Sequence, residues 1–154
     1  MTKSLADLIT LAGETNEFNQ YNGYAKAYED GYGIQYLAMK DLLEVGENCE
    51  ALEELRHGHA ADEIYLSWPP TPASLATEFA SGEEATAHFR ATTRGKPEGY
   101  IIEKLDAIIR SMGTLFEVAR VHGVDVSVIE DHLVGKIEYN AQRADTARSG
   151  VKSF

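Results

Sequence analysis

Apolar residues recur at three- and four-residue steps along several long segments, and this spacing predicts amphipathic α-helices. Two segments are the clearest, one from about 34 to 57 and one from Pro97 to about His122, each followed by a glycine that is expected to end it. The expected buried stripes are Ala38, Leu42, Val45, Cys49 and Leu52 in the first segment and Ile101, Leu105, Ile108, Met112, Leu115 and Ala119 in the second.

Two further helices are expected near the ends of the chain. Ser4 and Asp7 stand three residues apart, as in a capping box, and predict a helix start close to the N-terminus. Asp125 is expected to cap a last helix that reaches about Arg143. The apolar positions are Leu5, Leu8, Ile9 and Ala12 in the first of these helices and Ile129, Leu133 and Ile137 in the last.

The connections between these helices differ in character. The stretch 16–33 is rich in Tyr, Asn and Gly and predicts a connection with a short helical piece. The stretch 58–97 is the least regular, because the prolines after Trp68 exclude a helix interior, although 73–79 and 83–89 could each form a short helix. Its aromatic residues favour an ordered flap. No strand alternation or repeat is evident, so we expect one all-α domain over 1–154, a helical bundle of about four main helices with a long irregular connection at about 58–97.

Charge and composition narrow the function. The 154 residues carry a formal net charge of -11, which argues against nucleic acid or an anionic membrane as the main partner. Cys49 is the single cysteine, so an intrachain disulfide is excluded, as is usual in a reducing compartment. The sequence starts without an apolar signal core, and no apolar run approaches membrane length. A cytoplasmic protein is the expectation.

Two pairs of acidic residues give the first indication of chemistry. Glu47 and Glu50 stand three residues apart, as do Glu103 and Asp106. On a helix, side chains three apart share a face, so two neighbouring helices would gather four carboxylates. Mg²⁺ requires oxygen ligands of this kind.

Chance alone explains acidic pairs of this spacing, since a chain with 25 Asp and Glu residues is expected to contain about four of them. The competing interpretation is a solvated acidic face, and the spacing alone does not decide between the two. An iron or manganese carboxylate bundle is a weaker hypothesis, because such bundles use Glu-x-x-His pairs. No histidine stands three residues after Glu47, Glu50 or Glu103.

Cationic residues flank the second pair. Lys96 precedes the expected helix start at Pro97, and a lysine beside exposed N–H groups suits phosphate oxygens. Lys136, Asn140 and Arg143 recur at four- and three-residue steps and could grip a triphosphate. A loop that begins a helix and a solvated basic helix end explain the same residues equally well.

Four motifs in this order carry a resemblance: Glu47 to Glu54, Lys96-Pro97-Glu98-Gly99, Glu103 to Arg110, and Tyr139 to Arg143. Together they resemble the MazG-like all-α nucleoside triphosphate pyrophosphohydrolases, in particular their small single-domain branch. The resemblance covers about Tyr36 to Arg143, without the long middle connection.

The resemblance implies an oligomeric helical bundle, a homodimer or homotetramer, that uses Mg²⁺, with Mn²⁺ as a substitute, to split a nucleoside triphosphate into the monophosphate and pyrophosphate. Acidic faces opposite the apolar stripes also favour partner subunits that complete the bundle. The implied metal ligands and catalytic residues are Glu47, Glu50, Glu103 and Asp106. The implied phosphate-binding residues are Lys96, Lys136, Asn140 and Arg143, with Arg110 orienting a ligand carboxylate or touching phosphate.

The chain departs from the family pattern at two places. The first glutamate of the family motif Glu-Glu-x-x-Glu falls on Gly46, and the family tail Arg-Pro-x-Arg-His-Gly is replaced from Arg143 onward. These departures motivate an alternative function, a catalytically inactive helical oligomer that binds a nucleotide or a protein.

Overall fold

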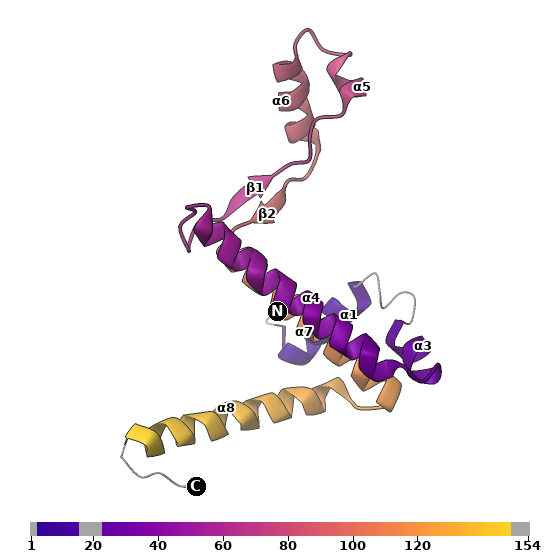
Figure 1. The fold of residues 1–154 in the computed structure, drawn as a ribbon, viewed down its shortest axis with the longest axis vertical. Helices are drawn as coiled ribbons and strands as arrows, with labels where there is room; N and C mark the ends of the chain where they lie inside the picture. Colours follow the sequence, from indigo (N-terminus) through magenta and orange to yellow (C-terminus); the bar gives the residue numbers. More distant parts are fainter. Residues whose placement is uncertain (1–2, 16–22, 149–154) are drawn as a thin grey trace. The chain divides into compact units, whose positions relative to one another are not determined.

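The computed structural model describes residues 3–15 and 23–148, with side chains as far as 142. Within these residues the chain is mostly helical, with seven helices and one two-stranded sheet, so the predicted all-α class is confirmed in its main character (Figure 1). In chain order the elements are α1 (Leu5–Thr15), α3 (Gly23–Glu29), α4 (Gly33–Arg56), β1 (Tyr65–Ser67), α5 (Ala73–Ala76), α6 (Gly82–Thr92), β2 (Lys96–Glu98), α7 (Tyr100–His122) and α8 (Val126–Arg148).

The chain divides into two compact units. The first comprises residues 1–44 and 108–154, and the second comprises residues 45–107. Each is described below by itself.

The start of α1, in the first unit, is capped as predicted. The Ser4 N–H donates to the Asp7 carboxylate at 2.9 Å, and the Asp7 N–H donates to the Ser4 hydroxyl at 3.1 Å, which is the reciprocal pattern of a capping box. The next two N–H groups, of Leu5 and Ala6, each donate to the carboxylate of Glu130 on α8 at 3.3 Å. An acid at this helix end is favourable, because it faces the positive end of the helix dipole.

The other predicted helix ends are mostly confirmed. α4 matches its prediction to within one residue at each end, and α7 ends at His122 as expected. The glycines that follow, Gly58 and Gly123, have φ of 92° and 65°, the left-handed region that ends helices. Asp125 accepts a hydrogen bond from the Ser127 N–H at 2.9 Å and so caps α8, which continues to Arg148, beyond the predicted end. Part of the connection at 16–33 lies outside the described residues, and α3 is the short helix expected in the rest.

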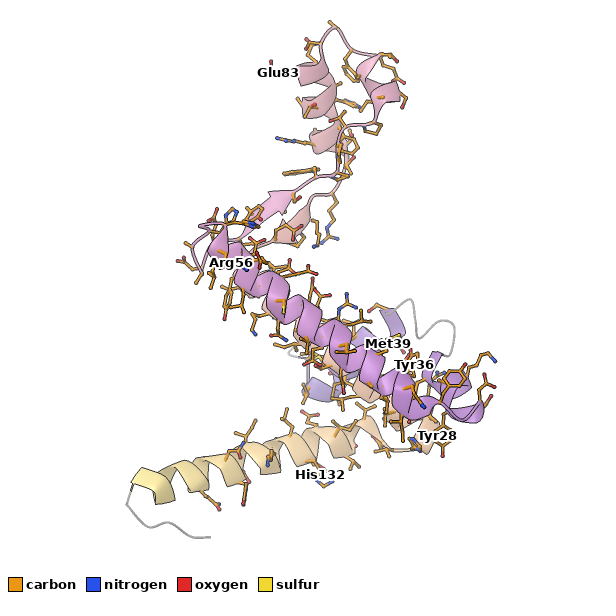
Figure 2. All side chains as sticks on the ribbon, viewed as in Figure 1. Tyr28, Tyr36, Met39, Arg56, Glu83 and His132 are labelled. Carbon is orange, nitrogen blue, oxygen red and sulfur yellow. The ribbon has the colours of Figure 1, made fainter. Side chains whose placement is uncertain are left out.

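The prediction of which helix faces are buried was wrong over most of α4 and α7. Leu42 and Leu52 of the expected α4 stripe are 71% and 56% exposed. Met39, labelled on α4 in Figure 2, is also exposed. On α7 the exposed residues of the expected stripe are Ile101, Leu105, Ile108 and Leu115, and only Ala119 is buried.

Apart from Gly33 and Gly113, the buried positions of α4 and α7 are instead alanines and charged residues. They are Lys40, Glu47 and Ala51 on α4 and Glu103, Ala107, Glu117 and Ala119 on α7. The helical wheel separates an apolar from a polar face, but it does not state which of them faces inward. Here small alanines and charged groups occupy the inward face, and most of the bulky aliphatic side chains of both helices stay exposed.

A buried charged group lies in the first unit and consists of Lys40, Glu117 and Tyr36. The exposed fraction is 3% for Lys40 and 0% for Glu117, and the Tyr36 hydroxyl donates to Glu117 Oε1 at 3.4 Å. Burial raises the pKa of Glu117, while the positive charge of Lys40 lowers it. Burial likewise lowers the pKa of Lys40, and the charge of Glu117 opposes that shift. The two buried residues therefore each favour the charged form of the other.

The second unit contains a hairpin-like excursion between β1 and β2. The two strands are antiparallel, with Tyr65 opposite Glu98 and Ser67 opposite Lys96. No strand was predicted here, and Pro97 was predicted to begin a helix, so both predictions are wrong. Strands of three residues are too short to show an alternating pattern. The proline stands in β2, and α7 begins only at Tyr100.

The excursion itself is folded, as its aromatic residues predicted. Short helices were expected at 73–79 and 83–89; α5 begins as expected but ends at Ala76, and α6 covers the second range and continues to Thr92. The Ser81 hydroxyl caps α6 by accepting from the Glu84 N–H at 3.1 Å. Trp68 donates from its indole N–H to the Thr93 carbonyl at 3.2 Å. Gly95 is buried against the same indole, where an added Cβ would lie 2.8 Å from the ring.

Gly99 joins β2 to α7 in a conformation that other residues avoid. Its φ is +122°, and a Cβ at this position would collide with the carbonyl oxygen of Glu63. The carbonyl of Gly99 accepts from the N–H groups of Ile102 and Glu103 at 2.9 and 3.1 Å. The junction therefore fixes the spacing between the end of β2 and the first turn of α7.

We expect Gly99→Ala to destabilise the protein by more than about 3 kcal/mol, because it adds a steric collision to backbone strain of about 1–3 kcal/mol. Gly123→Ala is the matched control, since Gly123 also has a positive φ but no atom lies within 4 Å of an added Cβ. Urea unfolding followed by circular dichroism measures both. An equal loss of unfolding free energy in the two variants would contradict the steric restriction at Gly99.

Candidate metal centre

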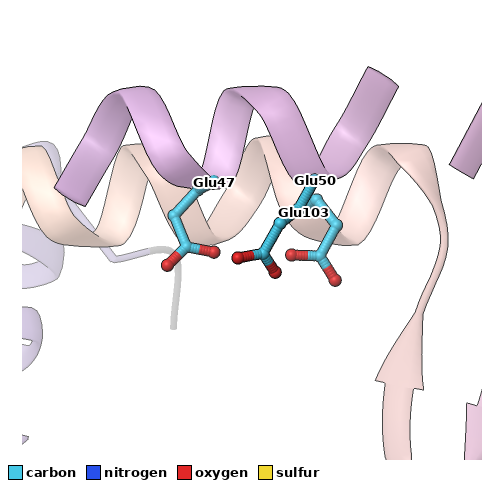
Figure 3. Close-up of side chains that lie close together, drawn as sticks. All are labelled: Glu47, Glu50 and Glu103. Atoms are coloured by element: carbon cyan, nitrogen blue, oxygen red, sulfur yellow. The ribbon is translucent and has the colours of Figure 1, made fainter. Parts of the chain in front are cut away.

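Three glutamates from two helices meet in the second unit. Glu47 and Glu50 project from α4 and Glu103 from α7, and one carboxylate oxygen of each lies within 4.8 Å of the others (Figure 3). Glu47 and Glu103 are buried, at 7% and 2% exposure, and Glu50 is exposed. The group is therefore open on the side of Glu50 and closed around the other two carboxylates.

Local sequence explains why these side chains meet. Glu47 and Glu50 are one helical turn apart and share a face of α4. Buried alanines follow the inward glutamates four residues later, Ala51 after Glu47 and Ala107 after Glu103. Small side chains at a contact let two helices approach closely. Beside the glutamates, the Lys104 ammonium of α7 donates to the Asn48 side chain of α4, which joins the two helices at this level.

The electrostatics of Glu103 are unusual. Its Oε2 is buried and accepts no hydrogen bond from any residue that the structure describes. Burial raises the pKa of Glu103 to about 7, and hydrogen bonding to Glu98 and the negative charges of Glu98 and Asp106 add to the increase. The Lys96 ammonium acts in the opposite direction and lowers the pKa. A buried carboxylate with an unpaired oxygen is costly in a protein that binds nothing there.

Lys96 lies beside the glutamates, as a residue on β2. Its Nζ is 3.0 Å from Glu98 Oε2 and 3.8 Å from Glu103 Oε1. The hydrogen bond to Glu98 raises the pKa of Lys96, with further increases from the charges of Glu103, Glu98 and Asp106. Lys96 was predicted as a phosphate ligand, and in this structure its ammonium contacts carboxylates.

Glu98 was not among the site residues predicted from the sequence. It stands two residues after Lys96 on the same strand, so the two side chains share a face of the hairpin. The available signal was the motif around Pro97, which was interpreted as a helix start. As a helix, the segment would have placed Lys96 and Glu98 on different faces, and only the strand brings them together.

The fourth predicted ligand, Asp106, is half-buried and is not among the three glutamates whose oxygens lie within 4.8 Å of one another. Its charge raises the pKa of both Glu103 and Lys96, so it lies near the group. Arg110 belongs to the first unit, where its positive charge lowers the pKa of Lys40. Roles for Asp106 as a ligand and for Arg110 at phosphate stay predictions.

The predicted phosphate-binding residues of the last helix are not part of the second unit. Lys136 and Asn140 are exposed on α8 in the first unit, and the Lys136 Nζ lies 5.3 Å from the centre of the Tyr139 ring. The side chain of Arg143 lies outside the described residues. Their contribution to phosphate binding stays a prediction.

The donors present fit a hard divalent cation. All three side chains offer oxygen, the ligand atom that Mg²⁺ and Mn²⁺ prefer, and the unpaired Oε2 of Glu103 gives a cation an otherwise unsatisfied ligand. An iron or manganese carboxylate bundle of the Glu-x-x-His kind needs a histidine ligand, and this group of described residues contains none.

No helix among the described residues combines the length and the apolar character needed to cross a membrane. Comparisons with protein-family models, with curated proteins and with solved structures give no significant match.

Proposed function

We propose that this protein is a Mg²⁺-dependent nucleoside triphosphate pyrophosphohydrolase, which adds water to a nucleoside triphosphate and releases the monophosphate and pyrophosphate. The observation that carries the proposal is the meeting of Glu47, Glu50 and Glu103, two of them buried, around an oxygen of Glu103 that has no partner. The proposal is also supported by the resemblance of four sequence motifs, two of which contain these glutamates, to the MazG-like family.

In this proposal Glu47, Glu50 and Glu103 hold the cation, and Asp106 completes the acidic edge of the site. A bound Mg²⁺ would offset phosphate charge and lower the pKa of a water molecule that attacks phosphorus. Lys96 supplies a protein cation for phosphate oxygens. No serine or cysteine nucleophile is required, because water is the attacking group.

The charge of the chain makes cation dependence essential to this function. A protein with a formal net charge of -11 repels a triphosphate, and the carboxylates at the site increase the repulsion locally. A chelator should therefore abolish both turnover and tight nucleotide binding. Turnover that persists in excess EDTA would contradict the proposal.

A direct assay tests the function. Purified protein is incubated with Mg²⁺ and with ribo- and deoxyribonucleoside triphosphates, and both products are quantified by ion-exchange chromatography. Equal amounts of monophosphate and pyrophosphate support the proposal. Release of inorganic phosphate and a diphosphate would indicate a different cleavage, and no product with any nucleotide would favour the alternative below.

We further propose that a second copy of this chain covers the exposed apolar rows. Ile34 and Leu42 of α4 are 83% and 71% exposed, values that are unusual for bulky aliphatic residues. The polar face of the helix is turned inward, so the apolar face remains for a partner with an equivalent face. A homodimer or homotetramer buries such rows symmetrically.

Leu42→Asp is expected to convert the oligomer to monomer, because it places a charge in the apolar contact. Sedimentation velocity of the wild type and the variant measures the change. Asp41→Ala is the control, since the neighbouring Asp41 is also exposed but polar. A wild-type protein that sediments as a monomer at high micromolar concentration would contradict self-association.

One observation favours the second candidate function, an inactive nucleotide-binding or protein-binding oligomer. Gly46 stands where the resembled family has its first glutamate, and a Cβ added there would meet no atom within 4 Å. The position has room for a carboxylate but carries none. Nucleotide binding without product release, together with turnover gained in Gly46→Glu, would identify this candidate.

A further inference from the structure

Lys96 reaches the buried glutamate from an exposed position. Its side chain is 58% exposed, whereas the side chain of Glu103 is 3% exposed, and their charged atoms are 3.8 Å apart. This distance is that of an ion pair and is longer than a hydrogen bond. Lys96 therefore offsets the charge of Glu103 without satisfying its oxygens by a short contact.

Glu98 provides a second acceptor for the same ammonium. The Lys96 Nζ donates to Glu98 Oε2 at 3.0 Å, within hydrogen-bond range. The lysine stem is flexible, with four carbons between the backbone and the ammonium. Lys96 can therefore leave Glu103 while its hydrogen bond to Glu98 keeps it at the edge of the site.

The Lys96 ammonium is a poor match for the negative charge near it. The carboxylates of Glu98, Glu103 and Asp106 all act on it, and Glu103 also belongs to the group of three glutamates. Oε2 of Glu103 stays without a partner even though Lys96 faces Oε1. A divalent cation would carry twice the charge of the ammonium. The unpaired Oε2 of Glu103 could serve as one of its ligands.

From this geometry we propose that Lys96 is an internal competitor of the divalent cation at Glu103. With no cation bound, its ammonium offsets the charge of the buried carboxylate. When a cation binds, the ammonium leaves Glu103 and becomes available to the phosphates of the substrate. The release of Lys96 to the substrate phosphates rests on the proposed function. The exchange of Lys96 for a divalent cation requires only that the three glutamates bind that cation.

The exchange predicts an order of binding. Before a cation binds, Lys96 is engaged by Glu98 and Glu103, and the carboxylates repel a triphosphate. After a cation binds, Lys96 is released from Glu103 and the negative charge that repels the triphosphate is reduced. Nucleotide affinity should therefore rise when the protein is first saturated with a divalent cation.

The test measures binding of Mn²⁺ alone by the electron paramagnetic resonance signal of the free ion. Lys96→Met is expected to bind Mn²⁺ about fivefold more tightly than the wild type, which corresponds to about 1 kcal/mol of lost competition. Lys96→Gln is expected to behave in the same way, and Lys96→Arg is expected to stay close to the wild type.

The control separates direct competition from a general loss of positive charge. Arg94 is exposed and stands two residues before Lys96, so Arg94→Met removes the same charge from the same segment. Its effect should be less than about twofold and should vanish in about 0.5 M NaCl, because salt screens distant charges. The effect of Lys96→Met should persist in that salt. With a saturating cation, Lys96→Met should also raise the KM for the nucleotide.

The outcomes separate this inference from the proposed function. If Lys96→Met and Arg94→Met change Mn²⁺ affinity equally, the competition is refuted and the metal centre stands. If no form of the protein binds Mn²⁺, the metal centre and the competition both fail. If the competition is observed but no nucleotide is hydrolysed, the exchange stands and the pyrophosphohydrolase is refuted.

Discussion

Glu50→Gln is expected to reduce Mg²⁺-dependent pyrophosphate release by at least about 100-fold, because an amide offers a divalent cation a weaker ligand than a carboxylate. Glu50 suits this test, since its side chain is exposed while its oxygen lies within 4.8 Å of those of Glu47 and Glu103. The substitution preserves shape and adds no buried polar group. Folding should therefore be unchanged, and kcat, Mn²⁺ binding and circular dichroism are measured on the same samples.

The matched control is Glu53→Gln, one turn further along α4. Glu53 is exposed and forms an ion pair with Arg56 at 2.6 Å, and it is not one of the three glutamates whose oxygens lie within 4.8 Å of one another. Its substitution should therefore leave turnover within about twofold of wild type. Asp106→Asn tests the fourth predicted ligand. Full activity in Glu50→Gln would show that the metal centre is not part of the mechanism. Full activity in Asp106→Asn would refute only the assignment of Asp106 as a metal ligand.

Lys40→Met is expected to lower the free energy of unfolding by about 3–5 kcal/mol at neutral pH, because it leaves Glu117 buried without its cationic partner. The exposed fraction of Glu117 is 0%, and its Oε2 has no hydrogen-bond partner among the described residues, so its charge depends on nearby cations such as Lys40. Urea unfolding of the wild type and the variant at several pH values measures the loss.

The loss should grow as the pH rises. Burial raises the pKa of Glu117, and Lys40 lowers it, so removing Lys40 raises it further. A carboxyl group whose folded pKa exceeds its unfolded value of about 4.3 contributes most to stability below that pH. Its contribution is lost as the pH rises through the folded pKa. The difference between Lys40→Met and the wild type should therefore be smaller at pH 5 than at pH 8.

The double variant Lys40→Met, Glu117→Met separates this mechanism from a simple loss of packing. With both charges replaced by apolar side chains of similar length, most of the lost stability and the added pH dependence should disappear. If the double variant is as unstable as the sum of the two single variants, the residues do not act as a pair. Lys40 would then stabilise α4 by packing alone.

Helix positions and caps could be predicted from the sequence because their causes are local. Ser4 and Asp7 satisfy each other's N–H groups within one turn, and Gly58 and Gly123 end helices through their own backbone conformation. The convergence of Glu47, Glu50 and Glu103 was also predicted, because helical spacing places side chains on a face. The prediction of Asp106 as a fourth ligand is untested.

Which helix faces are buried, and where Glu98 lies, could not be predicted, because both depend on contacts between residues that are distant along the chain. A wheel could not show that Lys40 and Glu117 are buried, since burying a charge is favourable only beside a partner from another helix. Likewise, β2 pairs with a strand about thirty residues earlier in the sequence, and its three residues show no local strand pattern. The motif around Pro97 was therefore assigned the wrong structure, a helix start in place of a strand.

The close packing of Gly99 between β2 and α7 has a consequence for how this chain tolerates changes in length. The segment between Ser67 and Lys96 leaves and returns through paired strands, so insertions or deletions there can alter α5 and α6 without moving the carboxylates. Between Lys96 and Glu103 the same change would rotate Glu103 by about 100° per residue around the axis of α7. Homologues of this protein should therefore vary freely in the outer loop and keep an invariant count of residues from the lysine to the glutamate.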